Sequence, residues 1–438
     1  MISRDIDTLY DQFIADFETK SVLMADEPEN VREFRRHSFE HFRLLGFPSV
    51  KNEEWRYTHI APFLREVYST SSEKPGSLDQ SFLSSLQIRS LDGIRILLFN
   101  GKYLPEFSEL PPDSGIHVSA LTGAYQERLV SDYLGKIADA SKNHFVALNS
   151  ALFEDGLFIR VQDGRRIERP LHVIHVFSSE SNMFVQPRHL FVVGKASEVS
   201  LVESFLNFKN EAEIFINDVS EIEVGSDARV QHYTIHGGCE NARYIHHTEV
   251  RQAERSVYNN YKASFPGPAF LRNNLNVSLN GENIESHLYG LYLAGGRQVV
   301  DNHTIVDHLK PNCQSNELYK GVIKDEASGI FNGKIYVRKD AQKTNAFQKN
   351  NNLMLGKKAI VDSKPQLEIF ADDVKCSHGS TVGQFNEEAL FYLKSRGIGE
   401  ERAKALLIHA FAYDVLEKMP LASVKSHINK LIDEGLKT

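Results

Sequence analysis

The stretch from Leu157 to Val382 contains short apolar runs broken by Gly, Asn, Asp and Lys, with hardly any helical periodicity. Runs of this length, rich in Val, Ile and Phe, predict β-strands rather than helices. The chain therefore has to be built around one long all-β region. The clearest of these runs are Leu157–Val161, His189–Val193, Val199–Val202, Ile335–Val337 and Gln366–Ile369.

Two architectures fit such a region, an antiparallel sandwich or barrel and a parallel β-helix. The dipeptides Asn280-Gly281 and Asn332-Gly333 are hairpin signals, which favour the antiparallel arrangement. Asparagines that could form the turns of a solenoid favour the other one. No strict repeat is legible, so the pattern alone leaves both open. These asparagines are Asn273, Asn274, Asn276, Asn280, Asn283 and Asn350, Asn351 and Asn352.

Both ends of the chain have helical patterns. In the first 65 residues Leu9, Phe13 and Phe17 recur on one helical face, and the pattern ends near Pro48. The single tryptophan, Trp55, follows, and we expect it to pack at a joint between domains. The sequence thus predicts an N-terminal helical and mixed region over residues 1–150.

Residues 151–383 form the predicted β core, and residues 384–438 form a C-terminal helical region. Asn386 can cap a first helix that ends at Gly397. A second helix starts near Glu400 and stops before Pro420, and a third runs to Gly435. These helices could cover the last strands of the core or serve as a docking surface.

Charge and composition exclude several classes of protein. Acidic residues number 58 against 50 basic ones, and no basic run is present, so nucleic acid is not an expected partner. The segment Met1–Asp7 lacks the apolar core of a signal peptide, and no apolar stretch is long enough to span a membrane. We expect a soluble, cytoplasmic protein.

Three cysteines, Cys239, Cys313 and Cys376, are far apart, and no Cys-x-x-Cys pair occurs. An odd number of dispersed cysteines suits a reducing compartment. A resident iron-sulfur cluster usually needs about four protein ligands, which this chain does not offer at short spacing. Any such metal group must be shared with another chain or bound transiently.

The segment Asp372–Gly383 places Cys376 two residues before His378. On a strand, residues i and i+2 point to the same face. A thiolate beside an imidazole can bind iron, accept sulfur or activate a nucleophile. Cys376 and His378 are therefore the candidate metal-binding residues.

Other motifs are weaker or missing. His303 and His308 lie in a polar cluster, Asp301–His308, where hydrogen-bonded turns are a simpler explanation than a metal site. The sequence has no P-loop and no common hydrolase signature. A carbohydrate-active enzyme would need a carboxylate pair such as Asp372 and Asp373, but neighbours on a strand face opposite ways.

Several motifs along the whole chain closely resemble the SufB/SufD family of iron-sulfur cluster assembly scaffold proteins. The dipeptide His378-Gly379 resembles the SufD branch, whereas the SufB branch typically has His-Glu. The motifs that carry the resemblance are Gly46–Thr58, Asp301–His308, Leu318–Val322, Phe331–Val337, Ala341–Ala346, Lys364–Ile369, Asp372–Gly379, Leu390–Leu393 and Ser395–Ile398.

The resemblance implies a mainly β fold, with a right-handed parallel β-helix core and helical regions at both ends. It implies a non-catalytic scaffold subunit of a SufBCD complex, with a role in iron acquisition. SufB would pair with the β-helix, and the SufC ATPase would bind the helices between Glu387 and Met419. A homodimer is the alternative when the chain is alone.

The resemblance also implies that His378 is a ligand of a transient iron-sulfur cluster shared with SufB. Cys376 matches a neighbouring cysteine of the family and is the weaker candidate of the two. No cofactor is expected to be bound permanently. Whether a reduced flavin associates with the complex stays open.

Overall fold

The computed structural model describes residues 3–64, 66–70, 80–112, 114–207, 212–238 and 241–437. Cys239 therefore lies outside the described residues. The α-helices are α1 (Ser3–Leu23), α2 (Glu29–Leu45), α3 (Gln80–Ser85), α4 (Arg128–Tyr133), α5 (His144–Leu152), α6 (Glu387–Ser395), α7 (Glu400–Leu416) and α8 (Ala422–Gly435). Short 3-10 helices are η1 (Glu53–Trp55), η2 (Ala61–Leu64), η3 (Pro105–Phe107), η4 (Thr122–Ala124) and η5 (Ala140–Lys142).

The strands form two long sheets. The first sheet contains, in spatial order, β2 (Lys102–Tyr103), β1 (Ile94–Phe99), β5 (Leu171–Phe177), β8 (Glu198–Asn207), β10 (Arg229–His236), β12 (Val257–Ser264), β14 (Glu285–Ala294), β16 (Gln314–Ile323), β18 (Asn345–Met354) and β20 (Lys375–Gly383). The second contains β19 (Ile360–Ile369), β17 (Ser328–Val337), β15 (Val299–His308), β13 (Phe270–Leu279), β11 (Ala242–Gln252), β9 (Ile214–Val224), β7 (Arg188–Val193), β4 (Gly156–Val161) and β3 (Ile116–Ala120), with β6 (Met183–Val185) beside β9.

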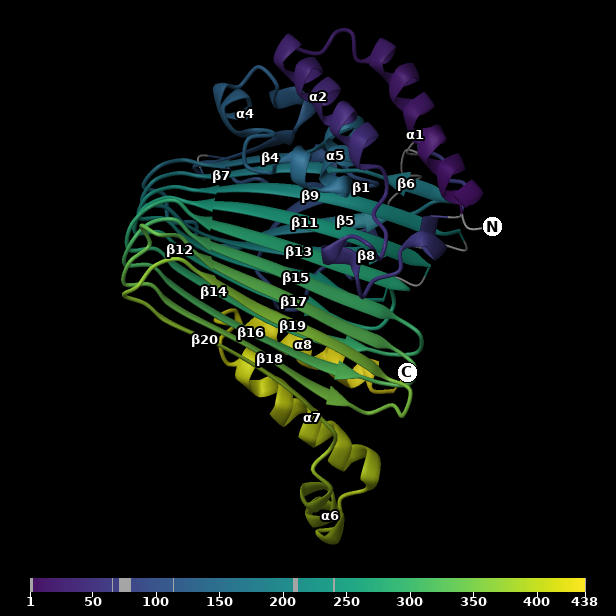
Figure 1. Cartoon of the computed structure of the whole chain (residues 1–438), viewed down its shortest axis with the longest axis vertical. Helices are drawn as coiled ribbons and strands as arrows, with labels where there is room; N and C mark the ends of the chain where they lie inside the picture. Colours follow the sequence, from purple (N-terminus) through teal and green to yellow (C-terminus); the bar gives the residue numbers. More distant parts are fainter. Residues whose placement is uncertain are drawn as a thin grey trace.

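From β8 onward the chain alternates between the two sheets, and each strand pairs in parallel with the strand of the previous turn. From β8 to β20 in the first sheet, paired residues are 28 to 31 positions apart in sequence. This is a parallel β-helix, visible as a stack of strands in Figure 1. The expectation of a mainly β fold with such a core and helices at both ends is confirmed.

The two Asn-Gly dipeptides do not form the antiparallel hairpins that they indicated, so that prediction is wrong. Asn332-Gly333 lies inside β17, which pairs in parallel with β15 and β19. A Cβ at Gly333 would lie 2.2 Å from the side-chain Nε2 of Gln348, so this glycine makes room for a neighbouring side chain. Asn280-Gly281 lies between β13 and β14, which belong to different sheets and do not form a hairpin.

Most of the asparagines predicted to form turns lie within strands. Asn273, Asn274 and Asn276 belong to β13, and residues 350–352 belong to β18. Their amides bond along the stack, as in the 3.0 Å contact from Asn273 Nδ2 to Asn302 Oδ1. Asn283 is a true turn residue, because its φ of 59° is the left-handed conformation that asparagine tolerates.

The interior between the two sheets, here called the lumen, has an apolar part and a polar part. The apolar part holds residues from both sheets, such as Leu201 and Val230 against Ile222 and Val250. Residues paired in register on neighbouring parallel strands point to the same face of the sheet, so the apolar residues form continuous rows along the stack. The polar part contains the buried histidines, carboxylates and amides described below.

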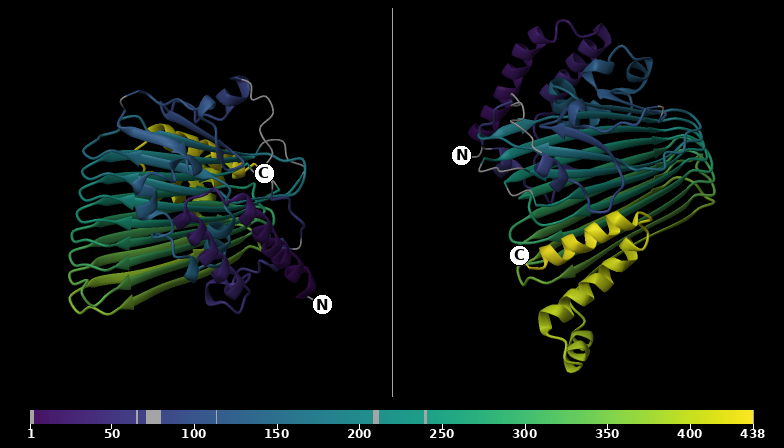
Figure 2. Two further views of the ribbon diagram at one scale, coloured as in Figure 1. Left: turned by 90° about the horizontal axis from the view of Figure 1, so that it is seen from above. Right: turned by 180° about the vertical axis from the view of Figure 1, so that it is seen from behind.

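Helices cover the start of the stack and parts of the outer faces of both sheets, but leave the last two strands largely exposed. In Figure 1 α1 and α2 lie beyond the first strands, and α6 extends past the last ones. Side chains of α1, α2 and α5 pack with Phe215 and Ile245 on the outer face of the second sheet. The helices α7 and α8 pack on the outer face of the first sheet, as seen from behind in Figure 2.

The predicted helices are found at both ends. Asn386 caps α6, because its side chain accepts a hydrogen bond from the Ala389 N–H at 3.0 Å. The helices α7 and α8 begin and end close to the predicted positions. No helix among the described residues is both long enough and apolar enough to cross a membrane.

Candidate functional site

The candidate residues Cys376 and His378 lie on β20, the last strand of the first sheet. The strand begins at Lys375, so the prediction that it includes Asp372 and Asp373 is wrong. Both aspartates are exposed in the turn between β19 and β20. Asp373 O accepts the Lys343 N–H there, and this backbone bond ties the turn to the previous one.

Cys376 and His378 alternate with Ser377 and therefore share one face of β20. Cys376 is half-buried and packs against the apolar residues of the lumen, while His378 is exposed. Partial burial raises the pKa of the Cys376 thiol. The free protein thus holds a thiol at this position, and a metal that binds it has to displace a proton.

The last turn of the helix, formed by β19 and β20 and here called the terminal turn, has no further strand beyond it in the described chain. Its two strands are linked by the Ser380 hydroxyl, which lies 2.8 Å from the Ser363 hydroxyl. An exposed edge strand presents unpaired backbone N–H and C=O groups, with which another chain can pair. Large apolar side chains exposed on and next to this turn are Phe347, Ile360, Ile369, Phe370 and Val382.

The two histidines of the segment Asp301–His308 do not come together to form a metal site. His303 lies on the outer face, with Nε2 2.9 Å from an oxygen of Asp301. His308 points into the lumen, where its Nε2 lies 2.9 Å from the Ser315 hydroxyl. The two histidines are five residues apart on β15, an odd number, so their side chains point to opposite faces of the sheet.

Asp301 instead fastens the N-terminal segment to the sheet. It accepts hydrogen bonds from Arg272 at 2.8 Å and from Thr58 at 2.5 Å. The guanidinium of Arg272 also lies 3.7 Å from the centre of the Trp55 ring. These buried contacts confirm that Trp55 packs at a joint. Burial raises the pKa of Asp301, but His303 most strongly, and then Arg272 and Thr58, hold it at about 2.

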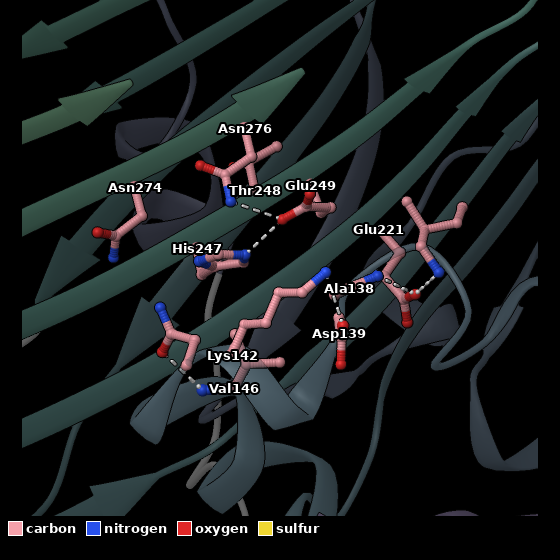
Figure 3. Close-up of polar contacts among 12 residues, drawn as sticks. Ala138, Asp139, Lys142, Val146, Glu221, His247, Thr248, Glu249, Asn274 and Asn276 are labelled. Carbon is pink, nitrogen blue, oxygen red and sulfur yellow. Dashed lines mark hydrogen bonds and ion pairs between the residues drawn. The ribbon is translucent and has the colours of Figure 1, made fainter. Parts of the chain in front are cut away.

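A polar groove of about 730 Å³ lies beside this joint, between the N-terminal region and the outer face of the second sheet. Figure 3 shows its central contacts, in which Glu249 accepts hydrogen bonds from His247 at 2.9 Å and from Asn276 at 2.8 Å. Nearby, Glu221 binds the backbone N–H groups of Ile137 and Ala138. Both carboxylates already have partners: Glu249 links two strands of the second sheet, and Glu221 fixes the N-terminal region to that sheet.

Sequence reasoning missed a group of buried residues at the start of the lumen. One ligand atom each from His175, His189 and Asp218 lie within 4.8 Å of one another. All three side chains are buried, and they come from β5, β7 and β9. The available signal was faint, because the residues come together only through the stacking of turns.

Hydrogen bonds occupy much of this cluster. The backbone N–H of Leu157 donates to His189 Nδ1 at 3.1 Å, which leaves the proton on Nε2, 3.1 Å from Asp218. The His175 Nε2 lies 3.1 Å from Glu203. Because Nδ1 of His189 accepts from Leu157 and Nε2 contacts Asp218, neither ring nitrogen is free for a metal, and the arrangement is that of a structural network.

Comparisons with known proteins point to one family. The model described as "SUF system FeS cluster assembly, SufBD core domain" matches residues 175–411, and that of the "SufBD protein N-terminal region" matches residues 7–173. The iron-sulfur cluster assembly protein SufD of Escherichia coli is 32% identical over 89% of this chain and 90% of its own length.

The Bacillus subtilis iron-sulfur cluster assembly protein SufD is 30% identical, with 94% of this chain and 95% of that protein covered. An iron-sulfur cluster assembly SufBD family protein of Synechocystis is 31% identical over 89% of this chain and 87% of its own length. The matches span both the helical N-terminal region and the β-helix. The chain therefore belongs to the SufBD family of iron-sulfur cluster assembly proteins.

Proposed function

We propose that this chain is a non-catalytic scaffold subunit of a SufBCD-type complex, in which an iron-sulfur cluster is assembled and then passed on. The cluster is cargo in this proposal, held for a time between two chains. The proposal extends to a role in iron acquisition at the same place. Family membership and the position of Cys376 and His378 on the terminal turn support it.

The observation that carries the proposal is the uncovered terminal turn. It combines an exposed imidazole, a half-buried thiol and exposed apolar side chains at one end of the β-helix. Two protein ligands do not complete a cluster site, since clusters usually need about four. A SufB-like partner that pairs with this turn would supply the missing thiolates and cover the apolar side chains.

A second docking surface is proposed on the C-terminal helices for a SufC-like ATPase. Phe391 and Tyr392 on α6 are 74% and 56% exposed, and Tyr413 on α7 is 60% exposed. Exposed aromatic side chains are typical anchors of protein interfaces. Free thiols at Cys313 and Cys376 fit the reducing cytoplasm that we propose as its location.

The test is anaerobic cluster reconstitution on the purified complex, followed by absorption and Mössbauer spectroscopy. We expect His378→Ala to leave complex formation intact and to lower the cluster yield strongly. Cys376→Ser should have a smaller effect, because its thiol is partly buried and protonated. A matched control is His287→Ala on β14, far from the terminal turn. Wild-type yield in His378→Ala would remove His378 as a ligand.

A further inference from the structure

Three side chains stand above one another in the lumen at the end of the β-helix. Glu317 on β16 pairs in register with Gln348 on β18, and Gln348 pairs in register with His378 on β20. In-register neighbours in a parallel sheet point the same way. Glu317 and Gln348 are 4% and 1% exposed, and His378 ends the row at the open turn.

The amide of Gln348 is bonded on one side only. Its Nε2 donates to Glu317 Oε2 at 2.7 Å, toward the inside of the stack. Its Oε1 is buried and has no hydrogen-bond partner among the described residues. A buried acceptor without a donor costs about 1–3 kcal/mol, so this oxygen has a strong requirement for an N–H or O–H group.

Local packing fixes this orientation of the amide. Above its pKa of about 7 the Glu317 carboxylate can only accept, so at the pH 8 of the test turning the amide around would place two oxygens against each other. Gly333 on the facing sheet leaves the space that the amide occupies, because a Cβ there would lie 2.2 Å from Nε2. The next residue in the row on the oxygen side is His378.

We propose that Gln348 is the positioning residue for His378. The structure does not contain this hydrogen bond, so the exposed imidazole has to rotate about its side-chain bonds until one ring N–H donates to Gln348 Oε1. The other ring nitrogen is then unprotonated and directed at the exposed end. A histidine that binds a metal commonly donates its second ring N–H to such an outer partner, which fixes both tautomer and ring orientation. The inference deepens the proposed function and rests on it where metal binding is concerned.

The primary test is the tautomer of His378 in the full chain, read from the 13C chemical shift of its Cδ2 after histidine labelling. His378→Ala identifies the signal. We expect one fixed tautomer in the wild type at pH 8. Gln348→Met keeps the length of the side chain but removes the acceptor, so the signal should move to the mixture found in free imidazole.

Two further variants guard against an effect of folding. Gly333→Ala pushes on Nε2 without removing the acceptor, and it should give an intermediate shift. Asn351→Leu lies on the same strand but faces outward, where Asn351 accepts from Thr381, and it should leave the signal unchanged. An unchanged His378 signal in Gln348→Met would overturn the inference.

The metal-dependent readout separates this inference from the proposed function. In the reconstituted complex, Gln348→Met should weaken iron binding about 10–100-fold, as loss of outer partners commonly does. If His378→Ala gives full cluster yield, the ligand role fails, although a fixed tautomer would still uphold the Gln348 contact. If His378→Ala lowers the cluster yield but His378 of the wild type shows a mixture of tautomers, the ligand role stands and the positioning role fails.

Discussion

Buried carboxyl groups in the lumen differ in charge because their partners differ. Burial opposes ionisation of Glu203, but His175 and His232 donate to it and hold its pKa well below the usual range. Glu317 has only amide and hydroxyl partners, and burial raises its pKa to about 7. One residue type thus serves as a permanent anion or as an acid that ionises only near neutral pH, according to its neighbours.

Glu317 gives a prediction at this scale. The folded chain holds the carboxyl proton of Glu317 more tightly than the unfolded chain does. The stabilising effect of this proton is complete below the ordinary carboxyl pKa of 4.5 and is lost as the pH rises through about 7. We expect Glu317→Gln to be more stable than the wild type by about 3 kcal/mol at pH 8.5. Well below pH 4.5 the two should be equal.

Denaturant unfolding monitored at several pH values measures this difference in the free energy of unfolding. The exposed Glu326 provides a control, and Glu326→Gln should not show the same dependence on pH. A difference that does not vary with pH would contradict the assignment of the proton to Glu317.

At the scale of elements, single long side chains attach the C-terminal helices to the β-helix. Lys320 on β16 is 5% exposed, and its Nζ donates to the backbone oxygen of Phe411 at 2.8 Å while it pairs with Asp414. Lys324 reaches the backbone oxygen of Gly435 at the end of α8 at 3.0 Å. These contacts join outward positions of the first sheet to two helices.

Lys320→Met should therefore loosen α7. It keeps the apolar stem but removes the charge and the donor, so the Phe411 carbonyl and Asp414 lose a partner, at about 1–3 kcal/mol. We expect faster amide hydrogen exchange in α7 and unchanged exchange in β13 and β15. Lys418→Met is the control, because the ion pair of Lys418 within the described part of the chain is with the adjacent, exposed Glu417 and joins no helix to the sheet. Equal protection of α7 in both variants would argue against the attachment.

At the scale of the whole molecule, the two proposed interfaces lie on different elements. The terminal turn exposes Phe370, and α6 projects beyond it with Phe391. Since one surface belongs to the β-helix and the other to a helix, a charge placed on one should leave the other competent to bind. Independent interfaces of this kind are what a three-component scaffold requires.

We expect Phe370→Glu to weaken binding of a SufB-like partner at least about tenfold and to leave SufC binding unchanged. Phe391→Glu should do the reverse. Sedimentation of the chain alone, with each partner and with both gives the affinities, and it also reveals whether a homodimer competes for the terminal turn. If both variants lose the same partner, the assignment of surfaces is wrong.

The sequence alone determined the strand content, the helical ends, the cap at Asn386 and the shared face of Cys376 and His378. These follow from local periodicity and capping chemistry, which depend on residues a few positions apart. Motif resemblance supplied the β-helix, because residue patterns by themselves left two architectures open. The Asn-Gly dipeptides misled about the architecture. The asparagines favoured the solenoid, which is confirmed, but most of them lie within strands, because a turn-forming residue is also accommodated inside a stacked strand.

Only the tertiary structure decided which residues meet across turns. The row from Glu317 through Gln348 to His378 joins residues about 30 positions apart, and the His175, His189 and Asp218 group joins three strands. Burial, which sets the pKa of Glu317 and leaves Gln348 Oε1 without a partner, is likewise created by stacking. Local sequence carries no record of register between turns, because register is set by how whole rows of side chains pack.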